Sequence, residues 1–236
     1  MISTLGFPVL VAAIIAYALT PFVKKLAFAA GAVDMPDERK VHKQPMPRLG
    51  GLAIYQAFTI AVLLAAPCSK DLFGILLGGT FIVVVGVLDD IYQLPAKVKL
   101  LGQILAALVL IAFDIKVEWM SNPFGTTEYI YLEYLSIPFT IFWVVAFTNV
   151  TNLIDGLDGL AAGVGAIASF TTACLAAQAG YMEPAIVSAA LFGAILGFIR
   201  YNFNPATIFM GDTGSMFIGY ILAAFSMDGA VKTAAT

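Results

Sequence analysis

The sequence predicts an all-α fold, a polytopic integral membrane bundle of about eight spanning helices that forms one domain over residues 1–236. Of the 236 residues, 61% are hydrophobic and 11% are charged, whereas a soluble domain is about half apolar and a quarter charged. The apolar residues also lie in long runs, and a helix needs about 20 of them to cross a bilayer. A water-soluble fold with a single core is therefore excluded.

The predicted spans follow one another along the whole chain. They cover residues 3–22, 50–67, 72–88, 99–113, 135–149, 159–178, 184–200 and 214–228. The first run lacks the basic start and the cleavage site of a signal peptide, so we expect it to be a retained span. The fourth and fifth runs are short, which predicts tilted or partly buried helices. Between these two, residues 116–133 are rich in aromatic and β-branched side chains and predict a small extracytoplasmic β-hairpin.

Basic residues favour one set of connecting segments. The segments after the first, third and seventh runs hold nine of the 12 Lys and Arg residues. The other three, Lys70, Lys116 and Lys232, lie in the alternate set of segments. The nine are Lys24, Lys25, Arg39, Lys40, Lys43, Arg48, Lys97, Lys99 and Arg200. Cytoplasmic loops of membrane proteins collect Lys and Arg. The sequence therefore predicts an outside N-terminus, with the odd-numbered loops in the cytoplasm.

Five aspartates lie at span ends on this predicted cytoplasmic face: Asp89, Asp90, Asp155, Asp158 and Asp212. The adjacent pair Asp89-Asp90 ends the third span, where the helix dipole disfavours each acid by up to about 1 kcal/mol. Two carboxylates in that position indicate a bound cation, although a solvated helix end is the alternative. Mg²⁺ is commonly held by one or two carboxylates together with waters and substrate phosphates.

The stretch NVTNLIDGLD, residues 149–158, repeats a polar residue every three positions. On a helix this spacing places Asn149, Asn152, Asp155 and Asp158 along one face. Polar groups at membrane depth are costly and indicate a site or a water-filled cleft. Asp158 would also serve as the N-cap of the sixth span, and Asp212 in FMGDTGS as that of the last. In company with the other acids, Asp212 is better explained as a metal ligand.

Four segments together resemble the polyprenyl-phosphate N-acetylhexosamine-1-phosphate transferases, and most closely the bacterial branch that loads GlcNAc-1-phosphate onto undecaprenyl phosphate. They are VDMPDERKVHKQPMPRLGG, DDIYQLPAKVKLLGQ, NVTNLIDGLDGLAAG and NPATIFMGDTGS, and they lie within residues 33–219. The resemblance implies that UDP-GlcNAc and undecaprenyl phosphate give undecaprenyl-diphospho-GlcNAc and UMP. This reaction would be the first membrane step of a cell-envelope glycan pathway, at the cytoplasmic face of the bacterial plasma membrane.

The resemblance also implies a cofactor, partners and residue roles. The cofactor is Mg²⁺, with Mn²⁺ as a substitute, and the partners are the two substrates, the lipid bilayer and a second copy of the chain in a homodimer. A nucleic-acid partner is not expected, because the net charge of −3 offers no basic footprint. The implied catalytic residues are Asp89, Asp90, Asp155 and Asp158; the substrate-binding residues are Lys43, Arg48, Asn149, Asn152 and Phe209; the metal ligands are Asp212 and Asp90.

Two alternatives within the family remain open. One is a phospho-MurNAc-pentapeptide-type translocase, and the other is a catalytically impaired, shortened relative or scaffold. The second arises because the family's later His- and Arg-rich loop is expected to be missing and His42 is the only histidine. A cation transporter is disfavoured, since the spans carry almost no charge. A CDP-alcohol phosphotransferase is disfavoured because that class has two further aspartates on the following helix, whereas residues 163–182 hold no acid.

Overall fold

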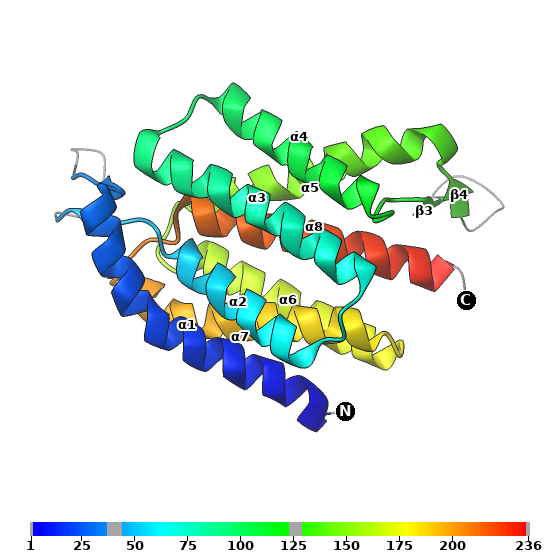
Figure 1. Ribbon diagram of the computed structural model, residues 1–236, viewed down its shortest axis with the longest axis horizontal. Coiled ribbons are helices and arrows are strands. Elements are labelled where there is room, and N and C mark those ends of the chain that lie inside the picture. Colours follow the sequence, from blue (N-terminus) through cyan, green and yellow to red (C-terminus); the bar gives the residue numbers. More distant parts are fainter. Residues whose placement is uncertain (1, 37–43, 123–128, 235–236) are drawn as a thin grey trace.

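Helices pack side by side in one bundle in the computed structural model, which describes residues 2–36, 44–122 and 129–234 (Figure 1). In this part of the chain they are α1 (Ile2–Ala30), α2 (Gly51–Ala65), α3 (Lys70–Tyr92), α4 (Ala96–Ala112), α5 (Ser136–Ile154), α6 (Leu160–Gln178), α7 (Met182–Asn202) and α8 (Gly211–Ala234). The short strands are β1 (Val33–Asp34), β2 (Met46–Pro47), β3 (Trp119–Ser121) and β4 (Tyr129–Tyr131). The predicted all-α membrane fold is confirmed.

Every predicted span overlaps a helix, but several helices extend beyond the predicted ends, among them α1, α5 and α8. Of the described helices, five are long and apolar enough to cross a membrane, namely α1, α3, α5 with the turn before it, α6 and α7. The short fourth run is confirmed, because α4 has 17 residues. The fifth run was placed too short, since α5 has 19 residues and continues through Asn149 and Asn152 to Ile154. The first run was also too short, because α1 continues past Pro21 to Ala30.

Helix α8 runs through the middle of the bundle and is the element on which both halves pack. It contacts α3 and α5 on one side and α2, α6 and α7 on the other (Figure 1). Every residue from Thr213 to Ile221 is buried. Because the N-terminal end of α8 begins at Gly211, this central position brings Asp212 between the two halves.

Small residues allow the outer helices to approach closely, as at the contact between α1 and α7. A Cβ atom added to Gly193 would lie 2.2 Å from the carbonyl oxygen of Val9, and one added to Gly197 would lie 2.2 Å from that of Ala13. Backbones that approach this closely are typical of helix pairs in membranes. The contact holds α1 against the core of the bundle.

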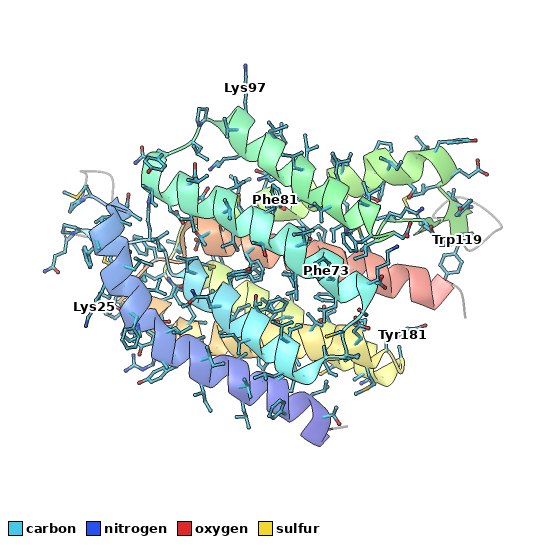
Figure 2. All side chains as sticks on the ribbon, viewed as in Figure 1. Lys25, Phe73, Phe81, Lys97, Trp119 and Tyr181 are labelled. Atoms are coloured by element: carbon cyan, nitrogen blue, oxygen red, sulfur yellow. The ribbon has the colours of Figure 1, made fainter. Side chains whose placement is uncertain are left out.

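The surface separates apolar side chains along the bundle from polar and aromatic residues at its ends (Figure 2). Phe73 is 61% exposed and Phe81 is 45% exposed on α3, as expected for side chains that face lipid. Lys25 and Lys97 lie toward the left-hand end of the view, whereas Trp119 lies at the opposite end (Figure 2). The predicted hairpin at that opposite end is confirmed, because β3 and β4 pair antiparallel.

The helices alternate in direction, so the odd-numbered connections gather at the left-hand end of Figure 1. There the short strands β1 and β2 pair antiparallel, and the connections at residues 93–95, 155–159 and 203–210 lie at the same end of the bundle (Figure 1). The two chain ends lie on the other side of the bundle (Figure 1). The acid-bearing segments therefore share one end, as their sequence positions predicted.

Candidate active site

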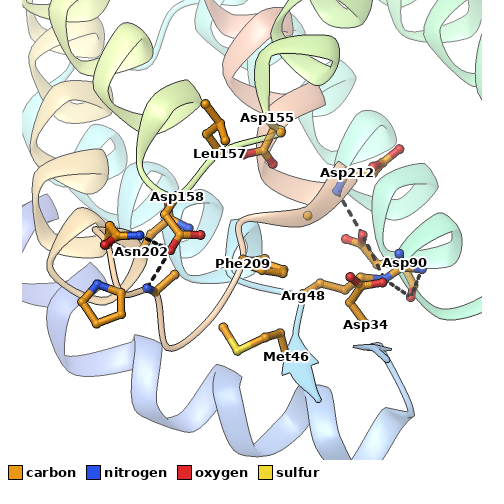
Figure 3. A pocket seen from close by; sticks show the side chains of 15 residues that line it. Asp34, Met46, Arg48, Asp90, Asp155, Leu157, Asp158, Asn202, Phe209 and Asp212 are labelled. Carbon is orange, nitrogen blue, oxygen red and sulfur yellow. Dashed lines mark hydrogen bonds and ion pairs between the residues drawn. The ribbon is translucent and has the colours of Figure 1, made fainter. Parts of the chain in front are cut away.

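Three connecting segments and the end of α3 surround a cavity of about 570 Å³ at this end of the bundle (Figure 3). Its lining residues are Asp34, Met46, Arg48, Asp90, Asp155, Gly156, Leu157, Asp158, Asn202, Asn204, Pro205, Ala206, Phe209, Gly211 and Asp212. Ligand sites in proteins usually have volumes of about 300–1,000 Å³. The cavity has the size of a small-molecule site, and five of its lining side chains carry carboxyl groups, opposed by one guanidinium.

The ammonium group of Lys99 bridges two of the acids beside the cavity. Its Nζ atom lies 2.6 Å from Asp212 Oδ2 and 3.2 Å from Asp89 Oδ2. The other carboxylate oxygen of Asp89 accepts the backbone N–H of Leu94 at 2.8 Å. These contacts tie together the end of α3, the start of α4 and the start of α8. From the sequence, Lys99 was counted only among the basic residues of the cytoplasmic segments, although its place in DDIYQLPAKVK pointed to the site.

The carboxylate of Asp90 faces the first turn of α8. The side chain is 2% exposed. Its Oδ1 accepts the N–H of Asp212 at 3.0 Å (Figure 3). Its Oδ2 accepts the N–H of Thr213 at 3.0 Å and the hydroxyl of Thr213 at 2.6 Å. The helix dipole favours an anion in this position. Thr213 is a partner that the sequence alone did not single out.

Arg48 joins the segment before α2 to the end of α3. Its Nε and Nη2 atoms donate to the backbone carbonyl of Asp90 at 3.1 and 3.0 Å. Nearby, the N–H groups of Gly50 and Gly51 donate to the carbonyl oxygens of Phe209 and Met210 at 3.0 and 2.8 Å. The first loop and the segment before α8 are thus held together by backbone pairing.

Gly211 occupies the tightest point of this junction. Its φ angle is +71°, and an added Cβ would lie 2.1 Å from the carbonyl oxygen of Arg48 and 2.6–2.7 Å from the carboxylate of Asp90. A side chain would therefore be strained in conformation and would also collide with its neighbours. Glycine at this position allows α8 to start directly against Arg48 and Asp90.

Of the polar residues predicted along one face at the end of α5, one lines the cavity and two contact neighbouring helices. Asp155 follows the last turn of α5 and lines the cavity (Figure 3). Its burial, together with the negative charge of Asp212, raises the pKa of this carboxyl to about 7. Asn152 donates to Ser215 Oγ at 3.0 Å, one turn along α8 from the start of the helix. Asn149 instead donates to Gln103 Oε1 at 2.7 Å and does not line the cavity.

Asp158 and Asn202 organise the far wall of the cavity. Asp158 Oδ2 accepts the Asn204 amide at 3.2 Å and the Ala206 N–H at 3.0 Å (Figure 3). The buried side chain of Asn202 accepts the N–H of Gly159 at 3.2 Å and donates to the carbonyl of Ile208 at 3.1 Å. Neither asparagine was singled out from the sequence, although Asn204 begins the segment NPATIFMGDTGS.

The structure brings most of the predicted site residues to one place. Those that line the cavity are Arg48, Asp90, Asp155, Asp158, Phe209 and Asp212. Asp89 and Asn152 do not line the cavity; Asp89 is linked to Asp212 through Lys99, and Asn152 donates to Ser215 of α8. Lys43 lies outside the described residues. The catalytic, substrate and metal roles of all these residues stay predictions.

A divalent cation fits the carboxylates that the cavity presents. Within the described ranges, no three Asp, Glu, His or Cys side chains form a group that could hold a metal ion by themselves. Mg²⁺ usually takes only one or two protein carboxylates and completes its shell with waters and substrate phosphates. Asp155 and Asp212 line the same cavity and interact electrostatically, so they suit a metal that is shared with a phosphate ligand.

Known proteins with similar sequences act on polyprenyl phosphates. A family model described as glycosyl transferase family 4 matches residues 72–230. The chain is 44% identical over 216 residues to a probable undecaprenyl-phosphate N-acetylglucosaminyl 1-phosphate transferase of Bacillus subtilis, across 91% of the chain and 60% of that relative. It is 41% identical over 239 residues to a decaprenyl-phosphate N-acetylglucosaminephosphotransferase of Mycolicibacterium smegmatis, across 94% and 59%.

A more distant similarity links the chain to another enzyme type. It is 34% identical over 223 residues to a phospho-N-acetylmuramoyl-pentapeptide-transferase of Caldanaerobacter subterraneus, across 88% of the chain and 68% of that relative. The chain spans about three fifths of the length of the Bacillus and Mycolicibacterium relatives. These similarities support a membrane transferase that takes part in cell-wall biogenesis.

Proposed function

The chain belongs to glycosyl transferase family 4, and we propose on that premise that it transfers GlcNAc-1-phosphate from UDP-GlcNAc to undecaprenyl phosphate. The products are undecaprenyl-diphospho-GlcNAc and UMP. A phosphate oxygen of the lipid forms a bond to the β-phosphorus of UDP-GlcNAc. The bond from that phosphorus to the oxygen bridging the two phosphates breaks, and UMP leaves with this oxygen.

The observation that carries the proposal is the cavity in which Asp155, Asp212, Arg48 and Phe209 meet at one end of the bundle. Phosphoryl transfer between two anions depends mainly on positioning and on charge neutralisation. The guanidinium of Arg48 donates two N–H groups to the backbone carbonyl of Asp90 and has further N–H groups that can donate to a phosphate. The half-buried ring of Phe209 offers a flat apolar surface for a uracil base.

Asp212 and Asp155 would hold Mg²⁺ in this proposal, and Mn²⁺ would substitute for it. When bound, the cation would neutralise charge on the diphosphate of the donor. Lys99 adds a second cationic group next to Asp212. Asp89 is the proposed acceptor for a proton of the polyprenyl phosphate, and Asp158 shapes the wall that faces the nucleotide-sugar.

Basic residues support a cytoplasmic location for this end of the bundle. Lys24, Lys25, Lys97 and Arg200 lie in the turns of α1, α4 and α7 toward this end of the bundle, and cytoplasmic segments of membrane proteins are enriched in Lys and Arg. UDP-GlcNAc is a soluble cytoplasmic metabolite in the proposed reaction, so the cavity would face its supply. The homodimer and the lack of a nucleic-acid partner stay predictions.

The test is UMP release by the purified chain in lipid nanodiscs. We expect release only when UDP-GlcNAc, undecaprenyl phosphate and Mg²⁺ are all present, and we expect EDTA to abolish it. Replacement of UDP-GlcNAc by UDP-MurNAc-pentapeptide distinguishes the alternative translocase. UMP release only with the pentapeptide donor, or no UMP release with either donor, would reject the proposed reaction.

Two variants test the residue roles in the same assay. Asp212→Asn should lower the rate of UMP release by about a hundredfold or more, because loss of one charge-stabilising group costs about 10²–10³ in rate. Asp114→Asn is the matched control, since Asp114 is exposed, lies at the opposite end and pairs with Lys70. Its φ angle of +66° is tolerated by Asn. An active Asp212→Asn variant would contradict the proposed metal site.

A further inference from the structure

Asp90 has an environment that differs from that of every other acid at the cavity. Its two oxygens accept three hydrogen bonds from the first turn of α8, and its side chain is 2% exposed. An ionised carboxylate offers about four acceptor sites. The Nε atom of Arg48 lies 4.0 Å from Oδ1 on the remaining side. A metal ion bound by Asp90 would therefore have only the one remaining acceptor site, with the positively charged guanidinium of Arg48 close by.

The hydrogen bonds of Asp90 determine where Asp212 points. One of the three donors is the backbone N–H of Asp212 itself, and the next is that of Thr213. The first N–H groups of a helix have no partner within the helix, so a carboxylate from α3 supplies the cap that α8 lacks. Gly211 permits this close approach. The start of α8, and with it the side chain of Asp212, is thereby held at a constant position beside Lys99.

We propose that Asp90 is a positioning residue that acts through Asp212, and that it is neither a metal ligand nor a proton acceptor. The inference rests on the proposed function, because it takes Asp212 as the metal ligand. It replaces the roles that sequence analysis predicted for Asp90 with a different one for the same residue. Asp89, the adjacent acid, keeps its own separate contacts with Lys99 and Leu94.

Thr213 provides the decisive comparison, because it contacts Asp90 directly and is fully buried. Thr213→Val removes the hydroxyl donor and keeps the shape of the side chain, whereas Thr213→Ser keeps the hydroxyl. Thr20→Val is the matched control. Thr20 is also fully buried and donates its hydroxyl to the carbonyl of Ala16 at 2.6 Å, within α1.

The readout is Mn²⁺ affinity without substrate, measured from the electron paramagnetic resonance signal of free Mn²⁺, together with kcat and KM for UMP release. We expect Thr213→Val and Asp90→Asn each to weaken Mn²⁺ binding, by about three- to tenfold for the loss of one charged hydrogen bond. The value of kcat should fall, and KM for UDP-GlcNAc should stay within about twofold of wild type. Thr213→Ser and Thr20→Val should bind Mn²⁺ as the wild type does.

Two results would overturn the inference. One is an Asp90→Asn variant that loses Mn²⁺ binding while Thr213→Val binds normally, since Asp90 would then be a direct ligand. The other is a wild type that binds no Mn²⁺. If Asp90→Asn does not fold, Thr213→Val with normal Mn²⁺ affinity is sufficient to reject the inference. A wild type that binds Mn²⁺ but releases no UMP rejects the proposed reaction instead, so the two failures are distinguishable.

Discussion

Replacement of Gly211 by alanine tests whether the junction between α8, Arg48 and Asp90 controls the site. The φ angle of Gly211 is +71°, and an added Cβ would lie 2.1 Å from the Arg48 carbonyl oxygen. Gly31, at the end of α1, is a matched control. Its φ angle is +73°, but nothing lies within 4 Å of an added Cβ. Both variants are conformationally strained, and only Gly211→Ala also creates a collision.

The two contributions have different magnitudes. A left-handed backbone conformation costs an L-residue about 1–2 kcal/mol, and overpacking of a close contact costs about 1–3 kcal/mol. Gly31→Ala should therefore reduce the free energy of unfolding by about 1–2 kcal/mol and Gly211→Ala by about 2–5 kcal/mol. At about 3 °C per kcal/mol for a chain of this size, the apparent Tm falls by about 4 °C and about 10 °C.

The assay heats the detergent-purified variants and follows the loss of the monodisperse peak on size-exclusion chromatography. UMP release is then measured about 15 °C below each Tm, where both variants are folded. Gly211→Ala should be at least about tenfold slower than wild type, because small misplacements in an active site cost that much or more, whereas Gly31→Ala should retain its rate. Equal Tm decreases in the two variants, or full activity of Gly211→Ala, would refute the reasoning.

Two further predictions concern charges at the site. Lys99→Met removes the ammonium group that Asp89 and Asp212 share. In EDTA, the free energy of unfolding of this variant should fall by about 1–3 kcal/mol, which is less than the cost of breaking a fully buried ion pair. Added Mg²⁺ should raise the Tm of this variant more than that of wild type, and an unchanged Tm in EDTA would contradict this account. Asp155 has its pKa raised from 3.8 to about 7, so the folded protein binds its proton more tightly than the unfolded chain. Its stabilising contribution is complete below about pH 4 and is lost as the pH rises through 7. In EDTA, wild type should therefore lose about 2 kcal/mol between pH 5 and pH 7 relative to Asp155→Asn; parallel Tm profiles of the two proteins would be the contrary result.

The helices of the bundle were predictable from hydropathy, but some of their ends were not. The first run was predicted to end at residue 22 because Lys24 and Lys25 lower its hydropathy, yet α1 continues to Ala30. A helix requires only continuous backbone hydrogen bonds, so charged residues can extend it beyond the apolar part. The same applies to α5, whose last turns carry Asn149 and Asn152 because Gln103 and Ser215 offer partners for their amides.

Part of the site required the packed structure to be identified. Lys99, Thr213, Asn202 and Asn204 received no individual role from the sequence, because their roles come from neighbours that are distant along the chain. Lys99 meets Asp212 across 113 positions, and Thr213 meets Asp90 across 123. No periodicity within one helix contains such a contact, because it depends on which helices pack together.

The sequence by itself determined that the acids share one end of the bundle. Alternating spans place every second connection on the same side, so counting the apolar runs was sufficient. Only the tertiary structure decided what each acid does there. Asp89 and Asp90 are adjacent in the sequence, but neighbouring residues on an α-helix point about 100° apart. One therefore faces Lys99 and the other faces the first turn of α8, and the oxygens that remain available to a ligand depend on those neighbours.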